Sequence, residues 1–479
     1  MILTTFLGFL LLFFLIGVSS YFFSRKTTSD YLVAGKSVSP ALVGLSAIAT
    51  NNSGFMFIGM IGATYTMGLS SIWLMIGWIF GDFIAQKLAV KQIQRHAQAD
   101  TVHSFGGLIV HWLVRDSEGK TSMTQVFRLR QLIGVLTLVF LVVYAAAQLK
   151  AGTKATQVLL GWSPETGIYL AAMIIFVYSL MGGLRASIWT DVAQSIVMLF
   201  GMASLAIFGI LSLMSSEQSV WEQLANAAPH YMNWLPSDMT STAAILFVIG
   251  WIFGGMGVIG QPQIVIRFMT LHPERTPGEM QAYYYAWFVT FYSLTVFVGL
   301  LSRLLIPVTA GFDAETALPT LATELMPKIF AGLILAALFA ATMSTVDSLV
   351  LSCSAALTRD LTRKPSQSLY FTKFATFTIL VVAVLIAISN NQTVFKMVLD
   401  AWGLLGSAFG PLIIWLSIGK RVTQNQAILM ILSGIAAFVL FSYFDWMAEV
   451  YPVAFGMLTG LIVAFLTSAV PSLQKQASN

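Results

Sequence analysis

The sequence predicts an all-α integral membrane protein with about 13 transmembrane helices. Hydrophobic residues make up 57% of the 479 residues and charged residues only 9%, whereas about a quarter of the residues are charged in soluble globular chains. Apolar runs of about 17 to 28 residues, long enough to span a bilayer, recur along the chain. The net charge of +5 is spread over the connections. The expected partner is therefore a lipid bilayer, not a nucleic acid.

The apolar runs give the expected spans in order. Residues 4–23 lack a basic region and a cleavage site, so we expect a membrane helix here and not a signal peptide. The longest connector, residues 91–129, has room only for a short amphipathic helix around residues 101–114. No soluble domain and no enzyme active site are expected. The other spans are expected at 40–66, 69–90, 130–150, 166–183, 188–213, 241–266, 281–307, 329–357, 371–390, 394–418, 425–444 and 449–470.

Lysine and arginine predict the orientation of the chain, because they collect in cytoplasmic loops. Assigning alternate loops to opposite sides gives 20 basic residues on one side and five on the other. The sequence therefore predicts a multi-pass protein of the cell (inner) membrane, with its N-terminus outside and its C-terminus cytoplasmic. The five residues on the outer side are Lys150, Lys154, Arg303, Lys328 and Lys396; the inner side includes Arg267, Arg359 and Arg363.

The second span places polar residues at its centre, in "LSAIATNNSGFMFIGM" from Leu45 to Met60. An unsatisfied polar group inside a bilayer costs several kcal/mol. We expect the helix to break near Ala49 to Gly54, so that released carbonyls can surround a cation and a polar solute. The alternative is a polar seam that joins neighbouring helices.

A similar interruption is expected in the seventh span, "FVIGWIFGGMGVIGQPQIVIRFM", where glycines precede Gln261 and Pro262. Proline removes a backbone donor and obstructs the preceding turn. Spans two and seven are five apart, and an odd number of spans per repeat places the two halves in opposite orientations. This is the inverted-repeat pattern of secondary transporters.

An ion site is expected on the ninth span. Ala341, Ser344, Thr345 and Ser348 follow the i, i+3, i+4, i+7 spacing of one helix face. Two hydroxyls and a carbonyl from this face, with two carbonyls from a broken helix, would form a five-oxygen cage for a hard cation such as sodium. Alternatively, the hydroxyls bond to carbonyls one turn back.

Two acids at membrane depth are candidates for a second ion or proton site with Ser348, because intramembrane acids are commonly functional. They are Asp191 and Asp347. The structural alternatives are that Asp191 caps its helix and that Asp347 pairs with a neighbouring helix. For Asp82 we favour a structural role, with a partner such as Lys87.

Several blocks together resemble the sodium/solute symporter family, particularly its proline-transporting branch: "SAIATNNSG", "GGLRASIWTDVAQ", "GQPQIVIRFM", "AATMSTVDS" and "AWGLLGSAFGP". The resemblance implies an extra N-terminal helix (1–39), inverted five-helix repeats formed by helices 2–6 (40–213) and 7–11 (214–418), and two C-terminal helices (419–479). It also implies a sodium site formed by the carbonyls of Ala49, Asn52 and Ala341 and the hydroxyls of Ser344 and Thr345.

The resemblance places the solute between the two breaks. Relative to the proline-transporting branch, Asn51 replaces an aspartate, Gly254 a tryptophan, Val258 a tyrosine and Asp347 a serine. We therefore expect a larger pocket of different charge, and a more anionic second ion position. The expected solute-binding residues are Asn51, Ser53, Gly54, Gly254, Val258, Gln261 and Pro262, of which Ser53, Gly54 and Pro262 match that branch.

The sequence thus predicts a sodium-coupled importer of a small polar solute that works by alternating access. The solute is expected to be an amino acid such as proline, or a related zwitterion or carboxylate. The first alternative is coupling to protons through Asp191 and Asp347. A second, of a different class, is a solute-sensing module that needs a separate output partner.

Overall fold

The computed structural model describes residues 1–117, 122–214, 217–236, 239–306, 311–363, 368–389, 393–444 and 446–469. Ten helices in these ranges are long and apolar enough to cross a membrane. Each expected span coincides with a helical segment, and the number of thirteen membrane crossings stays a prediction. The expected span ends at 307, 390 and 470, and the basic residues Lys120, Lys364 and Lys475, lie outside the described residues.

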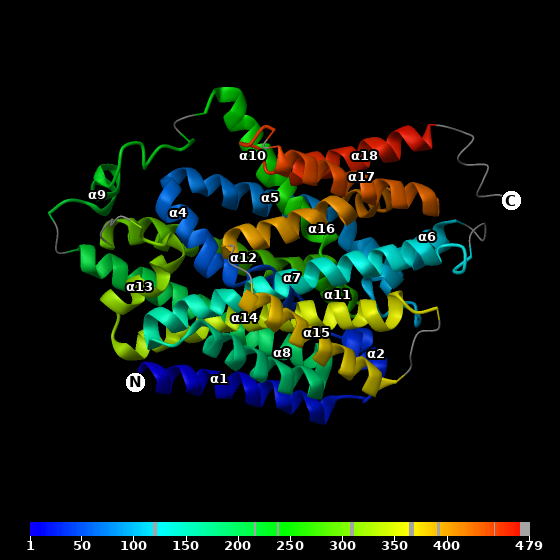
Figure 1. Cartoon of the computed structure of the whole chain (residues 1–479), viewed down its shortest axis with the longest axis horizontal. Helices are drawn as coiled ribbons and strands as arrows, with labels where there is room; N and C mark the ends of the chain where they lie inside the picture. Colours follow the sequence, from blue (N-terminus) through cyan, green and yellow to red (C-terminus); the bar gives the residue numbers. More distant parts are fainter. Residues whose placement is uncertain are drawn as a thin grey trace.

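Most of the long helices run along the longest axis of the molecule (Figure 1). The most buried are α14 and α16, since 83% of the apolar window of each is buried, against 22% for α1 at the edge. The long helices are α1 (Ile2–Ser19), α5 (Ile72–Ala97), α7 (Phe127–Leu160), α8 (Pro164–Leu213), α12 (Pro277–Leu305), α14 (Lys328–Ala355), α15 (Leu369–Ser389), α16 (Val394–Ser417) and α17 (Gln424–Tyr443), and the tenth membrane-length segment is Ser241–Gly260. A shorter apolar helix, α18 (Val453–Ser468), follows α17.

Two expected spans, 166–183 and 188–213, are the arms of the single helix α8. The helix bends at Gly183, where φ is 55°. A Cβ atom there would lie 2.4 Å from the carbonyl oxygen of Tyr31, so glycine permits both the bend and the close approach. The shorter connecting helices are α2 (Thr28–Val33), α6 (Phe105–Asp116), α9 (Val220–Asn226) and α13 (Ala317–Leu325), and α6 is the expected amphipathic helix.

Both expected breaks are confirmed. In the first, α3 (Pro40–Asn51) ends before Asn52 and Ser53, and the chain continues as the π-helix η3 (Met56–Met60) and then α4 (Ile61–Met67). In the second, α10 (Ser241–Met256) leads into the 3₁₀ turn η5 (Gly257–Gly260), and α11 (Pro262–Met269) follows an extended residue, Gln261. Pro262 begins α11, where its missing N–H leaves no backbone bond unmade.

A short parallel bridge joins the segments that flank these two broken helices. The Val38 N–H donates to the Thr270 carbonyl at 3.0 Å, and the His272 N–H donates to the Val38 carbonyl at 3.1 Å. The bridge pairs Val38 with Leu271. It therefore connects the entry to α3 with the exit from α11.

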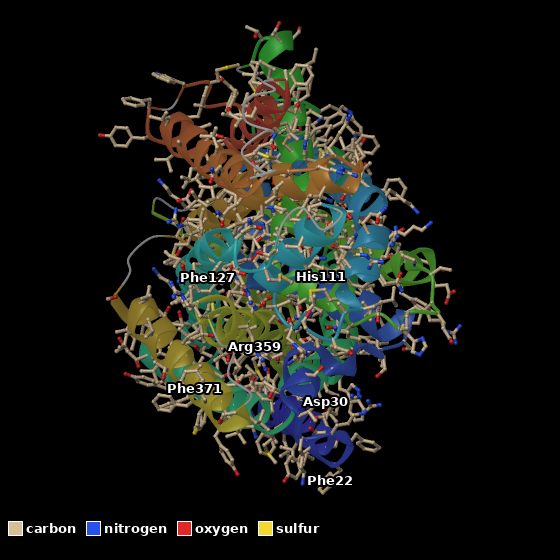
Figure 2. The ribbon with its side chains drawn as sticks, turned by 90° about the vertical axis from the view of Figure 1, so that its right-hand side faces the viewer. Phe22, Asp30, His111, Phe127, Arg359 and Phe371 are labelled. Atoms are coloured by element: carbon tan, nitrogen blue, oxygen red, sulfur yellow. The ribbon has the colours of Figure 1, made fainter. Side chains whose placement is uncertain are left out.

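The segments predicted to be cytoplasmic gather at one end of the bundle. In Figure 2, Asp30, His111, Phe127 and Arg359 lie on a single face, although they come from three different connections, of which 91–129 contains both His111 and Phe127. The N-terminus lies at the opposite end, on the left of Figure 1. This arrangement is the one that the alternate-loop assignment requires.

Candidate ion and solute site

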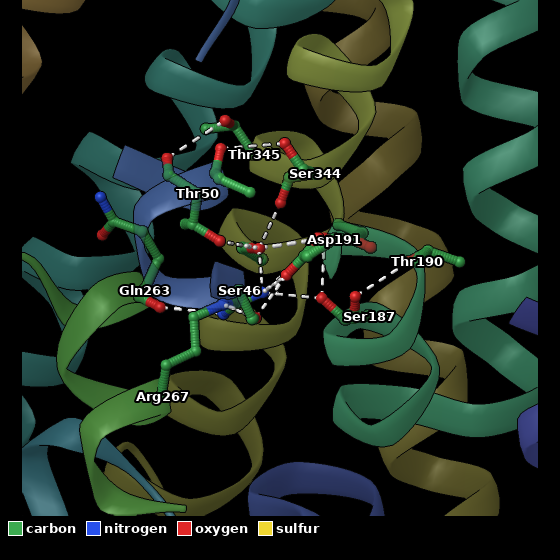
Figure 3. Close-up of polar contacts among 12 residues, drawn as sticks. Ser46, Thr50, Ser187, Thr190, Asp191, Gln263, Arg267, Ser344 and Thr345 are labelled. Atoms are coloured by element: carbon green, nitrogen blue, oxygen red, sulfur yellow. Dashed lines mark hydrogen bonds and ion pairs between the residues drawn. The ribbon is translucent and has the colours of Figure 1, made fainter. Parts of the chain in front are cut away.

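Two hydroxyls of α14 face the carbonyls of the first break. The Ser344 Oγ lies 3.1 Å from the Ala49 carbonyl oxygen, and the Thr345 Oγ1 lies 3.2 Å from that of Thr50. Both hydroxyls also lie within 3.1 Å of the Ala341 carbonyl oxygen. All five residues are buried. Five oxygens therefore converge where the sequence predicts the cation cage, and Figure 3 shows Ser344, Thr345 and Thr50 together.

The break explains why these carbonyls are available. The last regular helical bond of α3 runs from the Asn52 N–H to the Ile48 carbonyl, at 2.8 Å. Beyond it, the carbonyls of Ala49 and Thr50 lack the helical donors that a continuous helix would supply. The structure brings Ala49, Ala341, Ser344 and Thr345 together as expected. The fifth oxygen of the observed group is the Thr50 carbonyl, which lies 3.2 Å from the Thr345 hydroxyl. The expected fifth ligand was the Asn52 carbonyl, and its role stays a prediction.

A charged cluster lies beside the cage, and its centre is Arg267 of α11. The side chain is fully buried, and its Nη2 lies 3.0 Å from Asp191 Oδ2 and 4.0 Å from Asp347 Oδ1. Its Nε donates to Ser46 Oγ at 3.0 Å, and its Nη2 donates to Ser187 Oγ at 2.7 Å and to Ser348 Oγ. Figure 3 shows the guanidinium reaching from α11 toward Ser46, Ser187 and Asp191.

The two acids are held by hydroxyls as well as by the guanidinium. Asp191 Oδ2 accepts from Ser46 Oγ at 2.6 Å. Asp347 accepts from Tyr178 at 2.9 Å and from Ser187 and Ser348 at 3.0 Å each. Ser348 also lies 3.2 Å from the Thr50 hydroxyl. The cluster is therefore continuous with the cage.

The expectation that Arg267 belongs to a cytoplasmic loop is wrong, since the side chain is buried inside the bundle. The sequence did contain a signal for this burial, because Arg267 is the only charged residue in the apolar stretch "IVIRFM" directly after the second break. Tyr178 carried no comparable signal. Asp347 pairs with neighbouring helices, and the guanidinium of Arg267 lies between the two acids that were expected to share a cation.

Asp82 of α5 forms a second polar centre, next to Asn51. Its Oδ2 accepts from Tyr284 at 2.8 Å and from the Asn51 amide at 3.2 Å. Its Oδ1 accepts from Tyr285 and Gln86, both at 2.7 Å. Four donors therefore satisfy a fully buried carboxylate.

Lys87 is not its partner: the ammonium lies over the Phe83 ring, 5.3 Å from the centroid. A carboxylate thus lies beside Asn51, the position at which the resemblance implied the loss of an acid.

The second break is lined by aromatic rings. A Cβ at Gly254 would lie 3.0 Å from the ring of Tyr451, and Trp402 Nε1 donates to the Gly254 carbonyl at 2.8 Å. Tyr451 stacks on Trp251, with ring centroids 5.2 Å apart, and Trp78 lies 5.0 Å from Trp402. The expectation of free volume at Gly254 is therefore wrong, because Tyr451, from the segment before α18, fills that space.

The other expected solute residues lie around the same two breaks. The Gly54 N–H donates to Gln148 at 2.9 Å, and a Cβ at Gly54 would lie 2.9 Å from the Ala151 Cβ, so Gly54 packs directly on α7. Ser53 accepts from the Phe55 N–H at 3.2 Å. Gln261 donates to the carbonyls of Trp402, at 3.0 Å, and Gly257, at 3.3 Å. Val258 and Pro262 are buried.

A family model described as the sodium:solute symporter family matches residues 31–434, which is most of the chain. The chain belongs to this family. Membership makes it a sodium-coupled solute transporter and not an enzyme, with a solute and sodium as its transported partners. It also agrees with the multi-pass helical fold.

Relatives within the sodium:solute symporter family cover nearly the whole chain. The sodium/proline symporter of Escherichia coli (strain K12) is 27% identical over 469 residues, covering 95% of this chain and 90% of the relative. The high-affinity proline transporter PutP of Bacillus subtilis (strain 168) is 26% identical over 472 residues, covering 95% and 96%.

Solved structures show the same fold at lower identity. A Na⁺-coupled sialic acid symporter, in a substrate-bound outward-open state, superimposes with a TM-score of 0.80 at 20% identity and covers 98% of this chain and 97% of that one. The nucleobase-cation symporter Mhp1 has a TM-score of 0.56 at 15% identity, covering 95% and 99%. The overall fold is therefore shared with these two symporters.

Proposed function

We propose that this chain imports a small zwitterionic amino acid such as proline, or a related carboxylate, and that sodium binds in the cage at the first break. The observation that carries the ion site is the convergence of two α14 hydroxyls on the carbonyls of Ala49, Thr50 and Ala341. The names of the two bacterial relatives support the solute class.

Sodium binding would require only a local change at the cage. The hydroxyls of Ser344 and Thr345 donate to carbonyls, and rotation about their C–O bonds turns oxygen lone pairs toward a cation instead. The freed carbonyls and the carbonyl of Asn52 complete an all-oxygen shell of the kind that hard cations prefer. Sodium then holds α14 against the first break and fixes Asn51, two residues beyond Ala49.

The solute would bind between the two breaks. Asp82, held beside Asn51 and Tyr284, supplies the negative charge that suits the amino group of a zwitterion. The second break supplies the opposite wall, through Gly254, Val258, Gln261 and Pro262. Ser53 and Gly54 complete the first wall.

The charged cluster around Arg267 would interact with the cation after it leaves the cage toward the cytoplasm. Asp191 and Asp347 carry two negative charges and Arg267 one positive charge, so the cluster has a net charge of −1 when both acids are ionised. A net negative charge attracts a cation that moves inward. With Ser348, the two acids are the proposed second ion or proton position, and coupling to protons through them is the alternative function.

The proposed placement is the cell (inner) membrane, with the N-terminus outside and the C-terminus cytoplasmic, surrounded by lipid and without nucleic acid. The inverted repeats are assigned to 40–213 and 214–418, flanked by 1–39 and 419–479. At 100 mV, each positive charge that moves inward releases about 2.3 kcal/mol. The membrane potential alone would therefore drive uphill import.

The test is uptake of labelled proline into proteoliposomes under an inward sodium gradient, with unlabelled amino acids and short carboxylates as competitors. Replacing sodium with choline should abolish uptake, and an inward proton gradient should not restore it. Proton-driven uptake in choline would establish the alternative coupling. Solute binding without any uptake would favour a sensing module instead.

A further inference from the structure

The face that carries the predicted cytoplasmic loops contains a cavity that the transport pathway does not use. Its volume is about 720 Å³, and it lies between the start of α6, the start of α7 and the inner end of α14. Arg130, Arg359 and Arg363 line it together with His103, while Val110 and Phe127 supply apolar wall. Figure 2 shows Arg359 and Phe127 near the middle of this face.

Arg359 forms part of the cavity wall, where the nearby Asp360 interacts with it electrostatically but is already paired with Arg130. Only 4% of the residue is exposed, and its buried Nε has no hydrogen-bond partner in the described part of the chain. Among the described residues, no ion pair includes Arg359. A buried guanidinium with an unsatisfied N–H is costly unless an acceptor binds it.

The charges around the cavity favour an anion. Arg130 is already paired with Asp360 at 3.0 Å, and Asp100 interacts electrostatically with Lys36. Burial, and then the positive charge of Arg359, lower the pKa of His103 to about 4. The imidazole is therefore neutral near pH 7 and adds no charge of its own, so the positive charge of Arg359 is offset only by Asp360, which Arg130 shares.

Arg363 adds a second cation that reaches the cavity from its rim. The residue is exposed, and its guanidinium lies over the Phe127 ring, 5.7 Å from the centroid. Two guanidinium groups and an apolar wall form a suitable site for a phosphate group that is attached to an organic moiety.

We propose that the cavity between α6, α7 and the inner end of α14 binds a phosphate group, from a lipid headgroup or a soluble organophosphate, through Arg359 and Arg363. Arg359 lies in the π-helical segment η7 (Ala356–Asp360), which continues α14. The same helix carries Ser344 and Thr345. A phosphate held at η7 therefore contacts the inner end of the helix on which the ion cage is built.

The experiment uses the full chain in nanodiscs and follows its thermal unfolding by tryptophan fluorescence. One arm keeps phosphatidylcholine as the only lipid and titrates glycerol 3-phosphate at constant sodium. The other replaces part of the phosphatidylcholine with phosphatidylglycerol and adds no soluble phosphate. The variants are Arg359→Gln, Arg359→Lys and Arg363→Gln. The control is Arg275→Gln, an exposed arginine that lies 3.8 Å from Glu279.

We expect the wild type to be stabilised in one arm, and that arm identifies the source of the phosphate. The half-saturating amount of that probe should rise about tenfold in Arg359→Gln, because charge-assisted hydrogen bonds are lost. Arg359→Lys should retain part of the affinity, and Arg275→Gln all of it. No wild-type shift in either arm would overturn the proposal, and so would equal shifts in wild type, Arg359→Gln and Arg363→Gln. Arg363→Gln keeps the test open if Arg359→Gln does not fold.

Discussion

The two broken helices satisfy their freed carbonyls in different ways. At the first break, the carbonyls of Ala49 and Thr50 lie against the hydroxyls of Ser344 and Thr345. At the second break, the Gly254 carbonyl accepts from the indole of Trp402, and the Gly257 carbonyl accepts from the amide of Gln261. Both sets are buried, yet only the first is covered by groups that can present either a proton or a lone pair.

The difference assigns different chemistry to the two breaks. A hydroxyl can turn its proton away and become a cation ligand, whereas an indole N–H or the NH₂ of an amide always donates. The first break is therefore suited to reversible binding of a cation, and the second to a fixed wall. The helix that follows the second break, α11, instead places a permanently charged side chain, Arg267, beside the buried acids.

The largest expected effect is the loss of that permanent cation. Arg267→Met leaves Asp191 and Asp347 without their buried partner, and breaking a buried ion pair costs about 3–5 kcal/mol. The unfolding midpoint in detergent should fall accordingly. Adding Asp191→Asn to the same chain should recover part of the loss. Wild-type stability of Arg267→Met would show that the second break does not depend on its cation.

The next largest effect should be confined to the first break. Thr345→Ala removes one of five converging oxygens, and we expect the sodium concentration for half-maximal uptake to rise about tenfold. Thr345→Ser keeps the hydroxyl and should remain near wild type. The control is Ser352→Ala on the same helix, whose hydroxyl donates to the Ser348 carbonyl at 2.8 Å and to no other described residue. An unchanged sodium requirement in Thr345→Ala would place the ion elsewhere.

A smaller effect is expected at the wall of the second break. Gly254→Trp meets the ring of Tyr451, which would lie 3.0 Å from the new Cβ, and overpacking of this kind costs about 1–3 kcal/mol. The competition profile of solutes should change while the sodium requirement stays constant. Gly254→Trp combined with Tyr451→Ala should relieve the crowding. An unaltered profile in a folded Gly254→Trp protein would exclude this wall from the solute site.

The smallest effect should come from the acids themselves. Arg267 already supplies one positive charge at the proposed second ion or proton position, so Asp191→Asn and Asp347→Asn should lower the sodium Hill coefficient only modestly, or change the pH dependence of uptake if the position takes a proton. Asp191→Asn should slow uptake more, because its carboxylate lies 3.0 Å from the guanidinium and that of Asp347 lies 4.0 Å away. A lower Hill coefficient in either variant would support a second sodium ion here, and wild-type values in both variants would leave the acids structural. A changed pH dependence of uptake would assign a proton to the pair.

Local features made the breaks and the α14 face predictable. Asn52 and Ser53 interrupt one apolar run, while Gly260 and Pro262 interrupt the other. The i, i+3, i+4 spacing of Ala341, Ser344 and Thr345 places three oxygens on one face whatever packs against it. These predictions needed only helix geometry and the cost of unpaired polar groups in lipid.

Partners that arrive from distant segments could not be predicted in this way. Asp82 receives a hydrogen bond from Tyr284, 202 positions away, and Tyr451 fills the space at Gly254 from near the end of the chain. No spacing rule connects such residues. From Asn51 alone we expected a solute pocket that had lost a negative charge, but the fold places the carboxylate of Asp82 beside it.

The backbone bridge between Val38 and Leu271 makes the two interrupted helices mechanically dependent. Since it joins the entry of α3 to the exit of α11 through two hydrogen bonds, a tilt of either half-helix exerts a torque on the other. During alternating access the start of α3 and the end of α11 would then move as one rigid body. Spin labels attached beside residues 38 and 271 would keep a constant separation while labels on α15 change their distance from both.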